Sequence, residues 1–199
     1  MRDRQFNLAD LFEVVVDTVP DRLALVAGPD RLTYRELDGR ANRFAHSLTD
    51  RGVGTGAHVG ILAYNRAEWA EAMIGCYKAR TVPVNLNYRY VAPELRYVVD
   101  NADLEVLVFE QALAPLVGEA LDGAGPATLP ALVAIEDGSG ADAAGLTTTS
   151  FEFALASSSP DRDFGPRSPD DVYILYTDGG YYLCNQRYPG VMLAVNVAA

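Results

Sequence analysis

Short apolar runs alternate with longer amphipathic stretches along most of this sequence, and this alternation limits the fold more than any other feature. The runs predict strands at 58–63, 81–85, 105–109, 131–135 and 172–177, and the stretches between them predict helices near 66–79, 92–101 and 111–121. Strands and helices in regular succession are typical of the α/β class. We therefore expect a layered, largely parallel sheet that is flanked by helices on both faces.

The segment before His58 predicts a helix, two short strands and a second helix. The first helix covers 7–19 and ends at Pro20, and the strands at 23–27 and 31–34 are joined by a turn. Thr33 and Glu36 have the spacing of a capping box, so the second helix should begin at Tyr34 and stop before Gly52 and Gly54. The predicted buried stripes are Leu8, Leu11, Phe12, Val15 and Val19 in the first helix and Leu37, Ala41, Phe44, Ala45 and Leu48 in the second. In the helix near 66–79, the positions expected to point inward are Trp69, Met73, Ile74 and Tyr77.

Composition favours one domain with a long surface connection. Hydrophobic residues make up 49% of the 199 residues, which is enough for a core of ordinary size. Residues 122–171 are instead rich in Gly, Ala, Ser, Thr, Pro and Asp. We expect at most a strand at 131–135 and a short helix near 151–157 within this acidic connection.

The net charge and the cysteine content limit the classes of partner and the cellular compartment that we expect for this chain. The 16 basic and 27 acidic residues give a net charge of −11, which disfavours nucleic acid and anionic membrane surfaces. The only lysine is Lys78. Cys76 and Cys184 lack a disulfide or metal spacing, and no secretion signal or apolar membrane span is evident, so we expect a soluble cytoplasmic protein.

Several short motifs favour structural roles over chemistry. The glycines at 52–56 follow a helix and precede a strand, the reverse of a dinucleotide-binding turn. His46 and His58 lack a catalytic spacing to a nucleophile or acid, and Cys76 fits a buried position. A patch of tyrosines and arginines could stack bases or simply pack, and packing is favoured; it comprises Tyr88, Arg89, Tyr90, Arg96 and Tyr97. The acidic connection shows no dense metal-ligand spacing, so no metal site is expected.

Five sequence phrases together carry a family resemblance. They lie at 20–26, 31–43, 75–80, 82–90 and 94–102, and in that order they resemble the AMP-forming acyl-CoA synthetase or fatty-acid–CoA ligase family. The resemblance covers residues 7–177. It implies an incomplete N-terminal domain of the adenylate-forming, AMP-binding fold, and Arg80 stands where the family commonly has a helix-ending glycine.

The resemblance also implies a chemistry. Such enzymes activate a fatty acid or other carboxylate with ATP and Mg²⁺, release pyrophosphate, and pass the acyl group to coenzyme A in lipid metabolism. Their phosphates are held by a loop similar to Tyr-Thr-Ser/Gly-Gly-Thr-Thr-Gly-x-Pro-Lys-Gly, whose glycines admit backbone amides.

This chain departs from the family at that loop. Only Thr177, Gly179 and Gly180 remain as a phosphate-loop remnant, beside Asp178 and the bulky Tyr181 and Tyr182. The resemblance places the adenine contacts, the magnesium-binding glutamate and the C-terminal catalytic lysine further downstream. We therefore expect residues 1–177 to be a partial AMP-binding-type domain, 178–199 to be a degenerate tail, and the fragment to be inactive alone, with no catalytic residues.

Two other readings remain open. The chain could be a non-catalytic interaction or carboxylate-binding module that associates, with itself or a partner, through an exposed sheet edge. It could also be an unstable product that barely folds, because half of a family domain leaves half of a core.

Overall fold

The computed structural model describes residues 7–125, 129–143, 145–177, 180–185 and 192–195, with the backbone alone beyond residue 176. The helices are α1 (Leu8–Thr18), α2 (Tyr34–Asp50), α3 (Ala67–Ala79), α4 (Ala92–Asn101), the 3-10 turn η1 (Gln111–Leu113), α5 (Ala114–Leu121) and α6 (Phe151–Ala156). The strands are β1 (Leu23–Ala27), β2 (Asp30–Thr33), β3 (His58–Leu62), β4 (Val82–Asn85), β5 (Leu104–Glu110), β6 (Ala131–Ile135), β7 (Thr148–Ser150), β8 (Val172–Thr177), β9 (Gly180–Asn185) and β10 (Met192–Val195). The elements predicted from the sequence are all present, with their ends shifted by a few residues at most.

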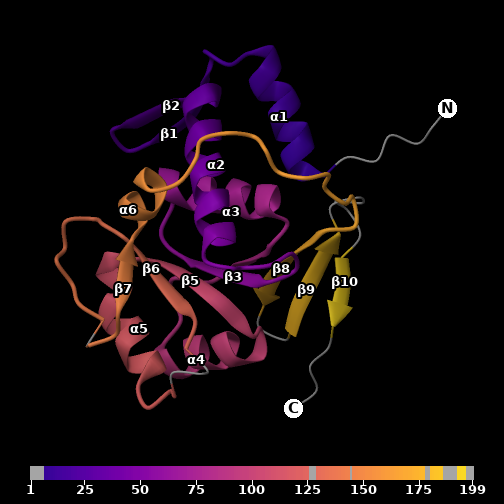
Figure 1. Cartoon of the computed structure of the whole chain (residues 1–199). Helices are drawn as coiled ribbons and strands as arrows, with labels where there is room; N and C mark the ends of the chain where they lie inside the picture. Colours follow the sequence, from indigo (N-terminus) through magenta and orange to yellow (C-terminus); the bar gives the residue numbers. More distant parts are fainter. Residues whose placement is uncertain (1–6, 126–128, 144, 178–179, 186–191, 196–199) are drawn as a thin grey trace.

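One large sheet forms the middle layer of the molecule (Figure 1). Its order is β10-β9-β8-β4-β3-β5-β6-β7, parallel from β8 to β7 and antiparallel from β8 to β10. Helices α2, α3 and α6 lie on one side of it, and α4 and α5 lie on the other (Figure 1). The expected α/β fold with a largely parallel sheet is confirmed. The sequence did not predict β7, β9 and β10.

The strands are buried on both faces because their side chains alternate between two cores. In β5, Val106 and Val108 join the core under α2, α3 and α6, whereas Leu107 and Phe109 join the core over α4 and α5. A strand that is covered on both sides reads as a continuous apolar run, which explains why these strands stood out in the sequence.

Helix α2 follows its predicted pattern closely. The Thr33 hydroxyl accepts a hydrogen bond from the Glu36 amide, and the Glu36 carboxylate accepts one from the Thr33 amide at 2.8 Å. All five predicted stripe residues of α2 are buried. Helix α3 packs closely on α2 at Gly75, where a side-chain Cβ would lie 2.8 Å from Phe44 Cδ1 and 2.9 Å from the Ala41 carbonyl oxygen.

The predicted inward positions of α3 were wrong in part. Trp69, Met73, Ile74 and Tyr77 are only half-buried, and the buried side chains include Ala72, Cys76 and Ala79. The small residues are buried because α3 lies between the sheet and α2, where close approach matters more than side-chain volume.

The predicted stripe of α1 was wrong in part. Leu8, Phe12 and Val19 are half-buried, and the Phe12 ring lies 6.2 Å from that of Tyr34, whereas Leu11 and Val15 are exposed. The buried residues of α1 are Ala9 and Val16, and the side of the helix that faces the protein also carries acidic residues, which the apolar periodicity did not indicate.

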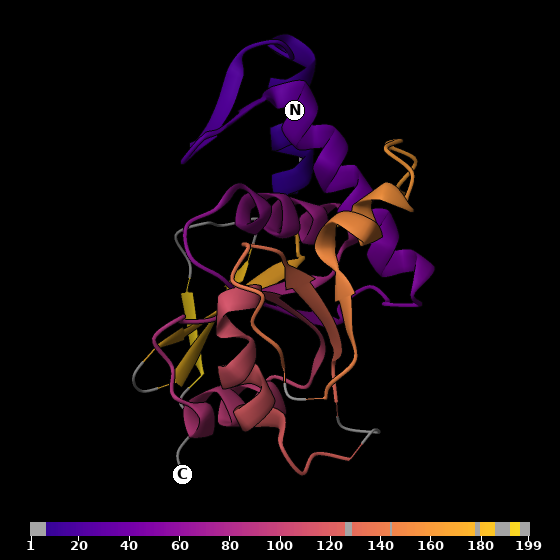
Figure 2. The same ribbon diagram turned by 90° about the vertical axis from the view of Figure 1, so that its left-hand side faces the viewer.

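The segment 122–171 contributes more to the core than a surface connection would. Besides β6 and α6 it supplies β7, and Phe151, Ala154 and Leu155 of α6 are buried against α2 and the sheet. After α6 the chain crosses over α2 and runs past α1 toward β8; Figure 2 shows the same arrangement from the side. We call residues 157–171 the strap.

Candidate functional site

The carboxyl ends of the parallel strands share one edge of the sheet, which is where open α/β folds bind ligands. We call it the carboxyl edge. It is the edge at which β3, β4, β5, β6 and β8 end, at Leu62, Asn85, Glu110, Ile135 and Thr177. The predicted phosphate-loop remnant therefore lies on the edge that a nucleotide site would use.

Strands β8 and β9 pair with each other at two residues of the predicted phosphate-loop remnant, Thr177 and Gly180. Thr177 pairs with Gly180, and the ladder continues through Tyr176 and Tyr181. Strand β9 also pairs with β10 on its other side, from Tyr181 to Cys184. The backbone of residues 181–184 therefore forms ladder hydrogen bonds with a strand on each side of β9. A phosphate-binding loop instead needs several free backbone amides that point at one anion. Asp178 and Gly179 lie outside the described residues, and so do the side chains of Thr177, Tyr181 and Tyr182.

An ion-pair group lies at the carboxyl edge beside β3 and β5. Arg66 donates to Glu110 at 3.0 Å and to Glu68 at 3.0 and 2.9 Å, and the Tyr64 amide donates to Glu110 at 3.0 Å. Hydrogen bonding to Glu68 holds the pKa of Arg66 above its usual value. Burial pushes the pKa of Glu68 upward, but its bonds from Arg66 outweigh this and leave it lowered. Because the single cation of Arg66 faces two carboxylates, the group carries a net negative charge and offers no free positive charge to a phosphate.

Aromatic residues border the same edge. The rings of Tyr64 and Tyr88 lie 4.8 Å apart, Arg89 lies over the Tyr88 ring at 5.5 Å, and the Trp69 indole donates to the Asn85 side chain at 3.2 Å. Tyr88 and Tyr97 are exposed, and Tyr90 packs against the core over α4 and α5. The predicted packing role therefore holds for Tyr90, but Tyr88 and Tyr97 are mostly at the surface.

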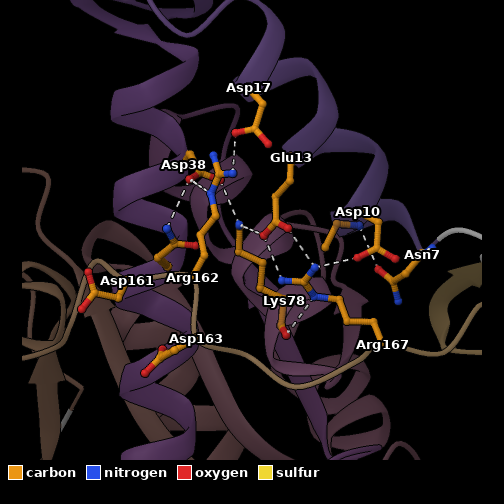
Figure 3. Close-up of polar contacts among 12 residues, drawn as sticks. Asn7, Asp10, Glu13, Asp17, Asp38, Lys78, Asp161, Arg162, Asp163 and Arg167 are labelled. Carbon is orange, nitrogen blue, oxygen red and sulfur yellow. Dashed lines mark hydrogen bonds and ion pairs between the residues drawn. The ribbon is translucent and has the colours of Figure 1, made fainter.

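Lys78, the only lysine, lies away from this edge. Helix α3 runs back from the carboxyl edge, so Lys78 near its end approaches the start of β4. Its side chain is fully buried and pairs with Glu13 of α1 and, at 2.9 Å, with Asp38 Oδ1 of α2 (Figure 3). A lysine held in this way cannot reach a phosphate at the carboxyl edge.

Two arginines of the strap complete the charge network around Lys78 (Figure 3). Arg162 donates to Asp38 at 2.7 Å and to Asp17 at 2.6 Å. Arg167 donates to Asp10 at 2.7 Å and to Glu13 at 3.0 and 2.9 Å. The network joins α1, α2, α3 and the strap, and sequence reasoning missed it because its members are far apart along the chain.

A second buried ion-pair group lies between α2, α3 and α6. Arg40 Nε donates to Glu71 at 2.6 Å, and its other nitrogens bind Glu152 of α6. Burial raises the pKa of Glu71, whose Oε2 atom has no hydrogen-bond partner. The group fastens α6 to α2 and α3 and does not open into the carboxyl edge.

The histidines and the described cysteine have structural contacts. His46 contacts the Asp161 carbonyl at 3.0 Å and Asp163 at 2.9 Å, and the His58 ring bonds to the Ala102 carbonyl. Burial raises the pKa of Cys76 to about 12, so its thiol stays protonated. The side chain of Cys184 lies outside the described residues.

Neither a metal centre nor a membrane helix is found in the described part of the chain. Within those residues, no group of three or more His, Cys, Asp or Glu side chains could hold a metal ion. None of the helices described is long and apolar enough to cross a membrane.

The sequence phrases and the sheet identify the family. A family model described as "AMP-binding enzyme" matches residues 12–179, which is most of the chain. The chain belongs to the AMP-binding enzyme family. The fold is that of the N-terminal domain of adenylate-forming enzymes, of which this chain covers part.

Several relatives of this chain are CoA ligases. A medium/long-chain-fatty-acid–CoA/3-oxocholest-4-en-26-oate–CoA ligase of Mycolicibacterium smegmatis is 46% identical over 175 residues, which cover 87% of this chain and 31% of the relative. A 3-oxocholest-4-en-26-oate–CoA ligase of Rhodococcus rhodochrous is 45% identical, with the same coverage of 87% and 31%. The solved fatty acyl CoA synthetase of Mycobacterium tuberculosis matches with a TM-score of 0.75 at 24% identity and covers 94% of this chain and 34% of that one. The chain thus spans about a third of the length of these relatives.

Proposed function

We propose that this chain forms the N-terminal sheet of a fatty-acyl-CoA ligase and does not activate a carboxylate by itself. The pairing of Thr177 with Gly180 carries the proposal, because it replaces the open glycine-rich loop with a ladder connection. The burial of Lys78 supports it, since the chain has no other lysine to offset phosphate charge.

The substrate class follows from the relatives. Ligases for medium- and long-chain fatty acids and for 3-oxocholest-4-en-26-oate are 45–46% identical to this chain, which supports a scaffold that belongs to an enzyme of lipid metabolism. We propose the cytoplasm as its compartment. ATP, Mg²⁺ and coenzyme A are the co-substrates and ion that such an enzyme uses. None of the three is expected to bind this chain tightly.

An assay of product release tests the proposal. The purified chain is incubated with ATP, Mg²⁺, coenzyme A and octanoate, palmitate or 3-oxocholest-4-en-26-oate, and AMP and pyrophosphate are measured. The full-length Mycolicibacterium smegmatis relative is the positive control. We expect no release above the rate without carboxylate, and robust turnover by this chain would overturn the proposal.

A second candidate function is association through a sheet edge. Strand β10 is the last strand on one side of the described sheet, and an edge strand offers unpaired backbone groups to another chain. Light scattering after gel filtration tests this candidate: a dimer at micromolar concentration supports it, and a monomer at every concentration excludes self-association.

The two buried cores favour a folded chain over an unstable product. Each core joins helices to strands that lie far apart along the sequence, such as Leu95 with Leu132 in one core and Phe44 with Val133 in the other. A single cooperative thermal transition is expected. A broad thermal transition without a folded-state baseline would instead favour the alternative that the chain barely folds.

A further inference from the structure

Helix α1 is attached to the protein mainly through charged contacts. Only Ala9 and Val16 of the helix are buried. Asp10, Glu13 and Asp17 are spaced by three and four residues, so they lie on one face of the helix. That face points toward Lys78 and the two strap arginines (Figure 3). Removing the arginines would therefore remove most of the charged contacts of α1 and leave the pair of Glu13 with Lys78 and the packing of Ala9, Phe12 and Val16.

The strap is attached to the helices through side chains. Asn42 donates to the Pro160 carbonyl at 2.8 Å and Arg43 to the Ser158 carbonyl at 2.6 Å, both from α2. Phe164 packs against the His46 ring, with centroids 4.5 Å apart. Most strap residues are exposed or half-buried. Segments with few buried apolar contacts are those that open locally at low free-energy cost.

The strap and α1 depend on each other. Arg167 binds two acids of α1, and Arg162 links Asp17 of α1 to Asp38 of α2. Asn7, the N-cap of α1, donates to the Ser168 carbonyl at 3.1 Å. If either segment leaves, the other loses its partners, so separate opening of one segment leaves buried charges unpaired.

We propose that α1 and the strap open together as one local unit while the sheet and helices α2 to α6 stay folded. The closed unit covers Lys78, and the open unit exposes it to solvent. The hollow of about 450 Å³ that α1, α2 and the strap enclose, lined in part by Asp17, Asp38 and Arg162, loses two of its walls on opening. This inference does not depend on the proposed function, because it concerns α1 and the strap and not the pairing of β8 with β9.

Acetylation of Lys78 measures the opening directly, because the chain has no second lysine. The native protein is treated with sulfosuccinimidyl acetate, and modification of the peptide that contains Lys78 is followed by mass spectrometry, which separates it from the α-amino group. Labelling through local opening should depend weakly on low urea concentrations, since little surface is exposed. A urea dependence as steep as that of global unfolding would overturn the proposal.

Variants of the network sharpen this test. Arg167→Gln should raise the native-state labelling rate of Lys78 by about tenfold or more, since it removes charge-assisted hydrogen bonds to α1. Arg35→Gln is the matched control, because Arg35 pairs with Asp21 at the surface of α2 and not with the strap; its rate should stay within about twofold of the native rate. Equal rates for native protein and Arg167→Gln would contradict the proposal. If Arg167→Gln does not fold, Arg162→Gln carries the same expectation.

Hydrogen exchange gives an independent readout on the unmodified chain. Amides of α1 and those of α2 should exchange with clearly different free energies of opening, and α1 should exchange faster. If α1 and α2 exchange at the same rate across urea concentrations, then α1 opens only in global unfolding and the proposal fails.

Discussion

Arg80 ends α3 in the left-handed conformation, with φ at 58°, and its guanidinium donates two hydrogen bonds to Asp171 at 3.1 and 3.0 Å. The conformation is one that a glycine adopts without steric cost, and the family commonly has glycine here. In this chain the arginine fastens the start of β8 to the end of α3. Arg80 therefore combines a strained backbone conformation with an ion pair to a residue that is distant in the sequence.

Two substitutions at position 80 separate these effects. Arg80→Ala loses the pair with Asp171 and keeps the strained backbone, whereas Arg80→Gly loses the pair and relieves the strain. We expect the alanine variant to be less stable than the glycine variant by about 1 kcal/mol. Urea unfolding of both variants measures the difference. An alanine variant of equal or greater stability would show that the left-handed conformation is not retained.

Gly75 and Gly39 form a matched pair of helical glycines. A Cβ at Gly75 would meet Phe44 and the Ala41 carbonyl oxygen, whereas a Cβ at Gly39 meets nothing within 4 Å. We expect Gly75→Ala to destabilise the protein by about 2 kcal/mol through overpacking of α2 against α3. Gly39→Ala should stabilise it by about 0.5–1 kcal/mol through helix propensity. Thermal melts test both signs, and stabilisation by Gly75→Ala would contradict the close packing.

Lys78→Met removes the buried cation and leaves Glu13 and Asp38 without it. We expect the free energy of unfolding to fall by about 3 kcal/mol, because removing one partner of a buried ion pair leaves the other charge uncompensated. Adding Asp38→Asn to this variant should recover part of the loss. Denaturant unfolding of both variants measures this, and a neutral effect of Lys78→Met would mean that the network does not hold Lys78 as described.

The acid dependence of stability should report on Glu13. Burial raises its pKa, but hydrogen bonds from Arg167 and Lys78 outweigh burial and leave the pKa below the ordinary value of 4.5. A carboxyl group with a lowered folded pKa contributes stability above its unfolded pKa and loses it as the pH falls through the folded pKa. Glu13→Gln should therefore be less stable than the native chain at pH 7, and the gap should narrow below about pH 4.5.

Urea midpoints between pH 7 and pH 3 measure this gap. Glu119→Gln, at an exposed position of α5, serves as the control and should track the native chain. A gap for Glu13→Gln that widens on acidification would contradict the assigned pairing.

The sequence predicted most of the fold because strands buried on both faces and a helix with a capping box leave clear local signals. Helix α2 and strands β3 to β6 were placed in this way. Strand β7 is three residues long, and its pairing with β6 depends on tertiary context. The inward face of α1 was misjudged because its partners, Arg162 and Arg167, lie more than 140 positions away along the chain.

The candidate site was predictable only in part. The family resemblance located the phosphate-loop remnant at Thr177, Gly179 and Gly180. Thr177 and Gly180 lie where β8 and β9 pair, and Gly179 is outside the described residues. The ion pairs of Arg66 with Glu68 and Glu110 went unnoticed, because Glu110 approaches Arg66 only once β3 and β5 are neighbours. The spacing of Arg66 and Glu68 alone carries no signal of a site.

Calorimetric titration of the chain with ATP in the presence of Mg²⁺ tests the central claim most directly. The full-length Mycolicibacterium smegmatis relative is titrated in parallel, so that a missing signal can be attributed to this chain. We predict no saturable heat for this chain, because its phosphate-loop position is a ladder connection and its lysine is buried. Saturable, Mg²⁺-dependent binding of ATP in the micromolar range would contradict the account.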